Sequence, residues 1–199
     1  VGNLFSNKLH ASRTINAMAS NRLRLRAMLA AAAVLAFAPG PAFGPGGAVA
    51  QGATPAAFLG VFIENDNAAF EPTSDAERAR AAKVEEQFKS LLEASGDYKF
   101  VPVTAAMRSR IAAGQAVGRC AGCELSYGRE LVVSRVAWIE VQNISNLILN
   151  MNVYVTDVAS GKSVVMHSVD IRGNTDESWS RSLSYLVKNY VLSKAGAGG

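Results

Sequence analysis

The segment Cys120-Ala121-Gly122-Cys123 is the only motif of the chain after residue 50 whose residue types and spacing suit redox or thiolate-metal chemistry. In a helix the two sulfurs would lie one turn apart, and the helix dipole would stabilise a thiolate at the helix start. Three interpretations are open: a structural disulfide, a catalytic dithiol and part of a metal site. Cysteines of exported chains are usually paired, which favours the disulfide.

The neighbours of the cysteine pair disfavour the other two interpretations. The motif lacks the preceding strand and the aromatic or proline neighbours of thioredoxin-type dithiols. One pair without a second Cys or His pair makes a weak metal site. Glu124, rather than histidine, follows Cys123, which disfavours covalent haem. We therefore expect an oxidised pair that is dispensable for activity, with no metal and no cofactor.

Two other polar features match no recognisable site. His167 is the sole histidine after residue 50, and no serine lies in a nucleophile-elbow context, so a catalytic triad cannot be assembled. Residues 64–72 carry acidic and amide oxygens, but their spacing matches no calcium loop. We expect a structural histidine, a solvated loop and no catalytic residue, which favours a non-enzymatic function.

The densest polar cluster surrounds the turn before the last expected helix and comprises Arg172, Asn174, Asp176 and Glu177, followed by Trp179. One interpretation is helix capping plus an ion pair, with Asn174 as the cap and Glu177 reaching back to it. The other is a recognition surface for a partner or a small ligand. Trp179 begins an apolar stripe, so we expect it to anchor the helix on the sheet; the alternative is an exposed hot spot.

The elements that must position these residues are clearest at the carboxyl end. Residues 147–157 alternate apolar and polar side chains, which predicts a strand with one buried face, although Ile148 and Tyr154 interrupt its polar side. Gly161 lies in the following turn, and a second strand over residues 163–171 completes a hairpin. The nearly continuous apolar run 130–141 predicts a central strand covered on both faces.

The remaining elements are two further strands and three helices. The strands are expected at 58–63 and 98–103. The helices are expected over 75–94 with a Ser74/Glu77 capping box, from Thr104 to Gly114, and after Gly173 to about Leu192. The pattern predicts an α/β (α+β) fold: a mixed sheet of about five strands with a C-terminal antiparallel hairpin and three to four helices packed on it.

The beginning of the chain indicates export. Arg22, Arg24 and Arg26 precede the uncharged segment 27–38, and Ala48-Val49-Ala50 provides a small-x-small cleavage site. The apolar segment is shorter than the roughly 20 residues needed to span a bilayer, so a signal peptide is favoured over a membrane anchor. We expect cleavage near Ala50 and a periplasmic protein without a stable membrane span.

This interpretation divides the chain into five parts. Residues 1–17 are expected to be a non-native upstream extension before Met18, and residues 18–50 the signal peptide. Residues 51–57 are a flexible lead-in, 58–194 a single α/β domain and 195–199 a flexible tail. After residue 50 there remain 15 basic and 16 acidic residues without a clustered basic face, which disfavours nucleic-acid binding.

Three motifs carry a family resemblance: Ser145-Asn146-Leu147-Ile148-Leu149-Asn150, Asp157-Val158-Ala159-Ser160-Gly161-Lys162 and Arg172-Gly173-Asn174-Thr175-Asp176-Glu177-Ser178-Trp179. With them, essentially the whole mature chain resembles the exported bacterial domains of unknown function DUF3280 or DUF2380. More distantly, the order of elements is similar to the small α/β domain at the amino terminus of TolB and in the CsgG and LpoB lipoproteins. The chain departs from the lipoproteins because it lacks a lipidated cysteine.

The resemblance implies a protein-interaction module of the cell envelope, and it brings no catalytic residues. We therefore expect a periplasmic accessory or adaptor protein that binds another periplasmic or outer-membrane protein. The alternatives are a thiol-disulfide redox protein that uses Cys120 and Cys123, and a small-ligand carrier.

Overall fold

The computed structural model describes residues 52–145 and 147–192. The expected upstream extension, signal peptide and cleavage site, and the expected tail at 195–199, lie outside the described residues. Within these residues, no helix combines the length and the apolar character that crossing a bilayer requires.

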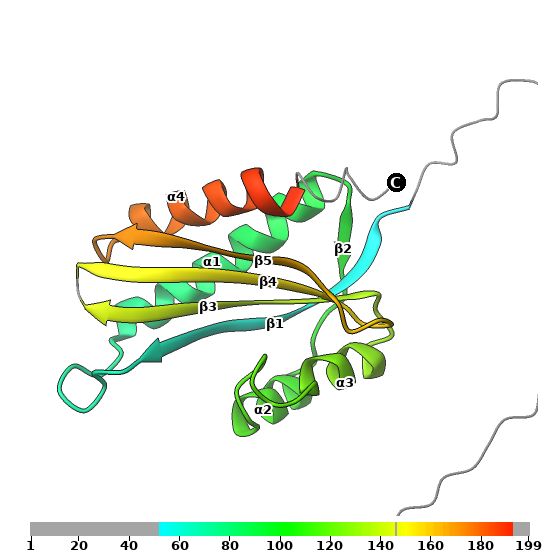
Figure 1. The fold of residues 1–199 in the computed structure, drawn as a ribbon, viewed down its shortest axis with the longest axis horizontal. Helices are drawn as coiled ribbons and strands as arrows, with labels where there is room; N and C mark the ends of the chain where they lie inside the picture. Colours follow the sequence, from blue (N-terminus) through cyan, green and yellow to red (C-terminus); the bar gives the residue numbers. More distant parts are fainter. Residues whose placement is uncertain (1–51, 146, 193–199) are drawn as a thin grey trace, which may run out of the picture. The chain divides into compact units, whose positions relative to one another are not determined.

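A five-stranded mixed sheet forms the centre of the fold (Figure 1). Its strands lie in the order β2-β1-β3-β4-β5; β1 runs parallel to β2 and β3, and the β3–β4 and β4–β5 pairs are antiparallel. The strands are β1 (Thr54–Asn65), β2 (Tyr98–Phe100), β3 (Arg135–Ser145), β4 (Ile148–Asp157) and β5 (Ser163–Arg172). The helices are α1 (Asp75–Ala94), α2 (Ala105–Ala113), α3 (Cys123–Glu130) and α4 (Asp176–Leu186), which continues as a π-helical turn over Val187–Val191. The predicted fold class is confirmed.

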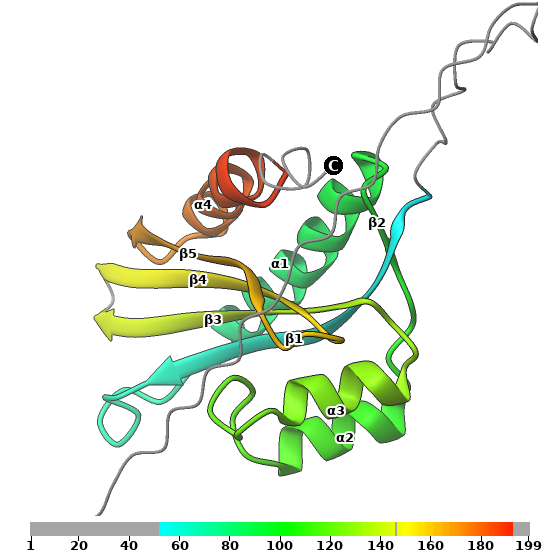
Figure 2. The same cartoon turned by 45° about the vertical axis from the view of Figure 1, so that its right-hand side comes forward.

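The helices form one layer on each face of the sheet (Figures 1 and 2). Helices α1 and α4 cover one face, and α2 and α3 lie against the other face near β1 and β3. The alternation predicted over residues 147–157 is confirmed from Leu149 onward, because the apolar side chains at 149, 151, 153 and 155 are at most 1% exposed beneath α1 and α4. Leu147 is 75% exposed and precedes the strand, so its predicted place on the buried face is wrong. The polar side of β4 faces the opposite way.

Strand β3 is the middle strand and is buried on both faces, as predicted. Ala137, Ile139 and Val141 belong to the core beneath α1 and α4, whereas Val136 and Trp138 belong to a second core beneath α2 and α3. Continuous apolar character is the pattern expected for a strand between two layers.

The predicted start of this strand at Glu130 is wrong, because Glu130 ends α3 and β3 begins at Arg135. Helix α3 packs closely on the sheet at Gly128, where a Cβ atom would lie 2.6 Å from Val158 Cγ2 and 2.7 Å from Val136 Cγ1. Of the apolar residues after Glu130, Leu131 and Val133 pack in the core beneath α2 and α3, whereas Val132 is 86% exposed. A short apolar run does not by itself distinguish such a connection from a strand.

Strand β1 begins at Thr54, four residues before the predicted start at Phe58. Thr54, Pro55 and Ala56 pair with Tyr98, Lys99 and Phe100 of β2. The backbone of residues 54–57, expected as a flexible lead-in, therefore belongs to the sheet.

The predicted cap of the last helix is also wrong by one residue. Thr175, not Asn174, is the N-cap, and its capping-box partner is Ser178 instead of Glu177. The side chain of Asn174 is unavailable for capping because it accepts hydrogen bonds from Trp179 Nε1 and Arg80, both at 3.0 Å. By contrast, the capping box of Ser74 and Glu77 at the start of α1 is confirmed.

Trp179 is 1% exposed and packs in the core between α4 and the sheet. Its indole N–H donates to Asn174 Oδ1, which satisfies the polar atom that burial removes from water. This burial matches the expected anchor and not an exposed hot spot.

We predict that Trp179→Ala lowers the free energy of unfolding by about 3 to 5 kcal/mol, because the variant loses the buried surface and leaves a cavity. Denaturant unfolding followed by circular dichroism measures the loss. Arg181→Ala, whose side chain is 71% exposed on the same helix, is the matched control and should stay within about 0.5 kcal/mol of the parent. Equal effects of the two substitutions would contradict the anchor role.

Candidate functional site

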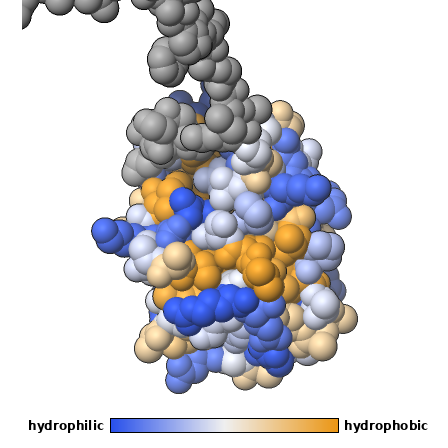
Figure 3. Space-filling model, turned by 90° about the vertical axis from the view of Figure 1, so that its right-hand side faces the viewer, coloured by the Kyte–Doolittle hydropathy of each residue, from blue (hydrophilic) through white to orange (hydrophobic). Residues whose placement is uncertain are grey.

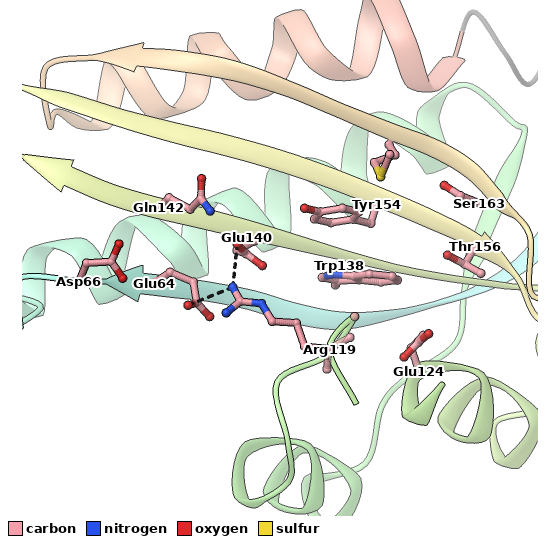
Figure 4. Close-up of a pocket in the computed structure, with 13 residues that line it drawn as sticks. Glu64, Asp66, Arg119, Glu124, Trp138, Glu140, Gln142, Tyr154, Thr156 and Ser163 are labelled. Carbon is pink, nitrogen blue, oxygen red and sulfur yellow. Dashed lines mark hydrogen bonds and ion pairs between the residues drawn. The ribbon is translucent and has the colours of Figure 1, made fainter. Parts of the chain in front are cut away.

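A pocket of about 610 Å³ lies on the sheet face that carries α2 and α3. We call it the β3–β4 pocket, because these two strands provide its floor (Figure 4). The remaining walls come from the end of β1, the segment between α2 and α3, and β5. It is lined by Glu64, Asp66, Val117, Gly118, Arg119, Glu124, Trp138, Glu140, Gln142, Tyr154, Thr156, Ser163 and Met166.

Two stacked aromatic rings form part of the floor. Trp138 of β3 pairs with Tyr154 of β4 in the sheet register, and their rings stack with centroids 4.9 Å apart and planes 11° apart. The backbone at Gly118 lies close to the indole, since a Cβ atom there would be 3.0 Å from Trp138 Cζ2. Burial, together with the negative charge of Glu140, raises the pKa of Tyr154, while Arg119 opposes the shift. The phenol is therefore a neutral hydrogen-bonding group at physiological pH.

One guanidinium joins two of the carboxylates that line the pocket. Arg119 Nη2 lies 3.0 Å from Glu64 Oε2 and 3.1 Å from Glu140 Oε1 (Figure 4). The hydrogen bond and the charge of Glu140, followed by those of Glu64, raise the pKa of Arg119 above its ordinary value. The Glu140 side chain is only 10% exposed, whereas that of Arg119 is 53% exposed. The buried carboxylate is thus held by a cation that remains open to solvent.

The lining groups of this pocket suit ligand recognition. Its lining residues provide four carboxylates, one guanidinium, hydroxyl and amide groups and two aromatic faces, without a histidine or a cysteine. Such groups bind ligands through charge, hydrogen bonds and stacking.

The two cysteines lie at the start of α3 and form a disulfide between Cys120 and Cys123. Gly122, with φ of +100°, precedes the helix, and the Cys123 backbone N–H donates to Cys120 Sγ. Glu124 brings a carboxylate oxygen to within 4.8 Å of both sulfurs, but the bonded sulfurs are not the thiolates that a soft metal requires. That the pair is dispensable for activity stays a prediction.

The predicted polar turn joins α4 to α1. Asp176 accepts hydrogen bonds from Arg80 at 3.0 Å and from Lys83 at 2.6 Å, and these bonds lower the pKa of Asp176. Asn174 contacts Arg80 and Trp179. The side chains of Asn174 and Trp179 therefore form contacts within the domain.

Two other residues of the turn remain at the surface. Arg172 and Glu177 are exposed, and Glu177 pairs with Arg181 one helical turn later. Partner binding through this turn therefore stays a prediction that would rest on these two side chains. The expected structural role of His167 matches a stacked contact with the Tyr190 ring, 4.1 Å between centroids.

Glu77 is a structural carboxylate that binds three elements together. Its Oε1 accepts from Asn143 of β3 at 2.9 Å and from Asn174 at 2.8 Å, while its Oε2 accepts from the Ser74 backbone and hydroxyl. Burial acts to raise the pKa of Glu77, but the hydrogen bonds from Ser74 and Asn174 outweigh it and hold the pKa below the ordinary value of 4.5. The ionised form is therefore the one that the fold stabilises.

A comparison with known sequence families now identifies the chain. The family DUF3280, described as "Protein of unknown function (DUF2380)", matches residues 54–191. The chain belongs to this family. The family resemblance predicted from the three sequence motifs is thereby confirmed. No curated protein matches the chain significantly in sequence.

Several solved structures are similar to the chain at low sequence identity. The LpoB C-terminal domain from Salmonella enterica shares 11% identity with a TM-score of 0.43, over 61% of this chain and 84% of that one. Lipoprotein GNA1162 from Neisseria meningitidis shares 15% identity with a TM-score of 0.43, over 73% and 98%. TolB from Acinetobacter baumannii shares 12% identity with a TM-score of 0.40, over 69% and 28%.

Sequence reasoning missed the β3–β4 pocket, although two residues signalled it. Tyr154 interrupts the polar side of β4, and Glu140 interrupts the apolar run of β3. A carboxylate inside a buried strand needs a partner, and an aromatic ring on an otherwise polar strand face is often covered. Sequence spacing did not reveal that partner, because Arg119 lies on a distant loop.

We predict that Glu77→Gln lowers the free energy of unfolding at about pH 7 by about 1 to 3 kcal/mol, since charge-assisted hydrogen bonds are lost. Because the pKa is lower in the folded than in the unfolded state, the contribution is complete above 4.5 and disappears as the pH falls through the folded value. The parent and the variant should therefore converge in stability as the pH falls from about 7 to well below 4.5. Denaturant unfolding across this range, with the exposed Glu86→Gln as control, tests this. A difference that stays constant with pH would contradict it.

Proposed function

We propose that this chain is a non-catalytic adaptor of the cell envelope that binds another envelope protein through one end of its sheet. The envelope location rests on the leader predicted from residues 18–50. The binding role rests on a group of large apolar side chains at the surface, which in a water-exposed domain mark interaction sites.

This surface, the apolar end, comprises Phe70, Ile144, Leu147 and Ile148, which are 86%, 66%, 75% and 44% exposed. The last three belong to the hairpin between β3 and β4. Phe70 lies in the loop after β1, whose last residue, Asn65, pairs with Asn143 of β3. The loop and the hairpin therefore extend from the same end of the sheet, at the left of Figure 1.

The segments that carry the apolar end are held by local hydrogen bonds. Asn65 Nδ2 donates to the Glu71 carbonyl at 2.7 Å, and the Phe70 backbone N–H donates to the Asn67 carbonyl. At the hairpin, the Gly173 N–H donates to the Leu147 carbonyl. A preorganised backbone loses less conformational entropy on binding, which favours a docking surface.

The other end of the sheet offers a weaker candidate. Apolar residues gather there too, but charged side chains interrupt them (Figure 3). Val132, 86% exposed with φ of +54°, lies in a shallow hollow together with Arg129, Arg135 and Asp157. One exposed valine among charges provides less apolar surface than the four side chains of the apolar end.

Site-specific photocrosslinking in native cells tests the proposal. A photoreactive amino acid at Leu147 should give a discrete adduct with one envelope protein. The same probe at Lys162, exposed in the turn between β4 and β5, should not. We further predict that Ile144→Asp abolishes the adduct without lowering the melting temperature, because this side chain is exposed and a charge in an apolar contact is costly. Equal adducts at both positions, or none at Leu147, would overturn the proposal.

A further inference from the structure

The β3–β4 pocket combines an aromatic face with an excess of negative charge. Trp138 is 5% exposed and Tyr154 stacks on it, so the rings are fixed by the sheet and by the second core beneath α2 and α3. The faces of such rings attract cations, and this attraction strengthens where water is excluded. The aromatic pair is thus preformed, and the half-buried Tyr154 ring, rather than the buried indole, is the one that a ligand in the pocket would contact.

The charged groups around this floor favour the same kind of ligand. Four carboxylates line the pocket, Glu64, Asp66, Glu124 and Glu140, against the single guanidinium of Arg119. Glu140 lies on β3, two residues from Trp138, so its carboxylate and the indole face the same side of the sheet. An anionic ligand would meet repulsion from the unpaired carboxylates.

Arg119 shows that the pocket accommodates a guanidinium. One nitrogen of its side chain contacts both Glu64 and Glu140, and the segment that carries it passes over the indole at Gly118. Since half of this side chain is exposed, Arg119 can leave the two carboxylates without disrupting a core. The carboxylates would then be open to a second cation.

We propose that the β3–β4 pocket binds an organic cation, a guanidinium or alkylammonium group, between the Trp138–Tyr154 pair and the carboxylates of Glu140 and Glu64, with Arg119 as the internal competitor for these carboxylates. The group can belong to a free small molecule or to an arginine or lysine side chain, since both present the same chemistry. The pocket shares no residue with the apolar end, and this proposal stands independently of the adaptor function.

Titration of the full chain with agmatine tests the proposal, with the Trp138 indole N–H observed by ¹H–¹⁵N NMR. Agmatine carries a guanidinium and an ammonium group. N-butylurea, which lacks the charge, and succinate, which carries the opposite charge, are the matched controls. We expect saturable shifts of the Trp138 signal with agmatine alone. A blocked Gly-Arg-Gly peptide is titrated in the same way, with its citrulline analogue as the uncharged control. Its affinity relative to that of agmatine shows whether a peptide-borne or a free guanidinium binds more tightly.

Three substitutions separate recognition from a structural ion pair. Glu140→Gln should weaken agmatine binding by about tenfold or more, because it removes a charge-assisted contact. Glu64→Gln tests the same contact at a more exposed carboxylate if the first variant is unstable. Arg119→Gln should strengthen binding, because it removes the competitor. Glu130→Gln, whose carboxylate pairs with Arg110 outside the pocket, should leave the affinity unchanged.

The direction of the Arg119→Gln effect decides the proposal. If Arg119 itself holds the ligand, this variant weakens agmatine binding, and the cation site is wrong. Binding of succinate in preference to agmatine, or equal binding of agmatine and N-butylurea, also overturns it. Each variant is compared with the parent by thermal melting, so that a loss of folding is not mistaken for a loss of binding.

Discussion

The burial of strand β3 on both faces is the constraint on which the rest of the structure depends. One face of β3 packs beneath α1 and α4, and the other packs beneath α2 and α3. Each of the two cores therefore draws residues from this strand. The neighbouring strand β4 is different, because only its inner face, at 149, 151, 153 and 155, is fully apolar.

The β3–β4 pocket follows from this difference between adjacent strands. Helices α2 and α3 lie against β1 and β3, and the outer side of β4 continues the sheet with Tyr154 and asparagine side chains. At the boundary between β3, which helices cover, and β4, which is less covered, the Trp138 ring stacks on Tyr154 and the Glu140 carboxylate pairs with Arg119. A sheet covered by helices along only part of one face thus leaves a site that the segment between α2 and α3 and the end of β1 complete.

The features that could be predicted from the sequence were those that local periodicity and capping residues encode. The alternation of β4, the hairpin, the central place of β3 and the Ser74/Glu77 capping box all depend on residues close in the chain. The errors had tertiary causes. Asn174 is hydrogen-bonded to Arg80 and Trp179, so Thr175 becomes the cap, and α3 extends to Glu130 with Leu131 as its C-cap, which delays the start of β3. The pocket could not be predicted from the sequence, because Arg119, Glu64 and Glu140 come from three separate segments.

Native-state hydrogen exchange measures most directly whether β3 is the central constraint. The account predicts that the backbone amides of Ala137, Ile139 and Val141 exchange only through global unfolding, because opening β3 exposes both cores. The hydrogen-bonded amides of β5, at the sheet edge, should exchange through smaller local openings. Exchange of the β3 amides at a lower free energy of opening than those of β5 would contradict the account.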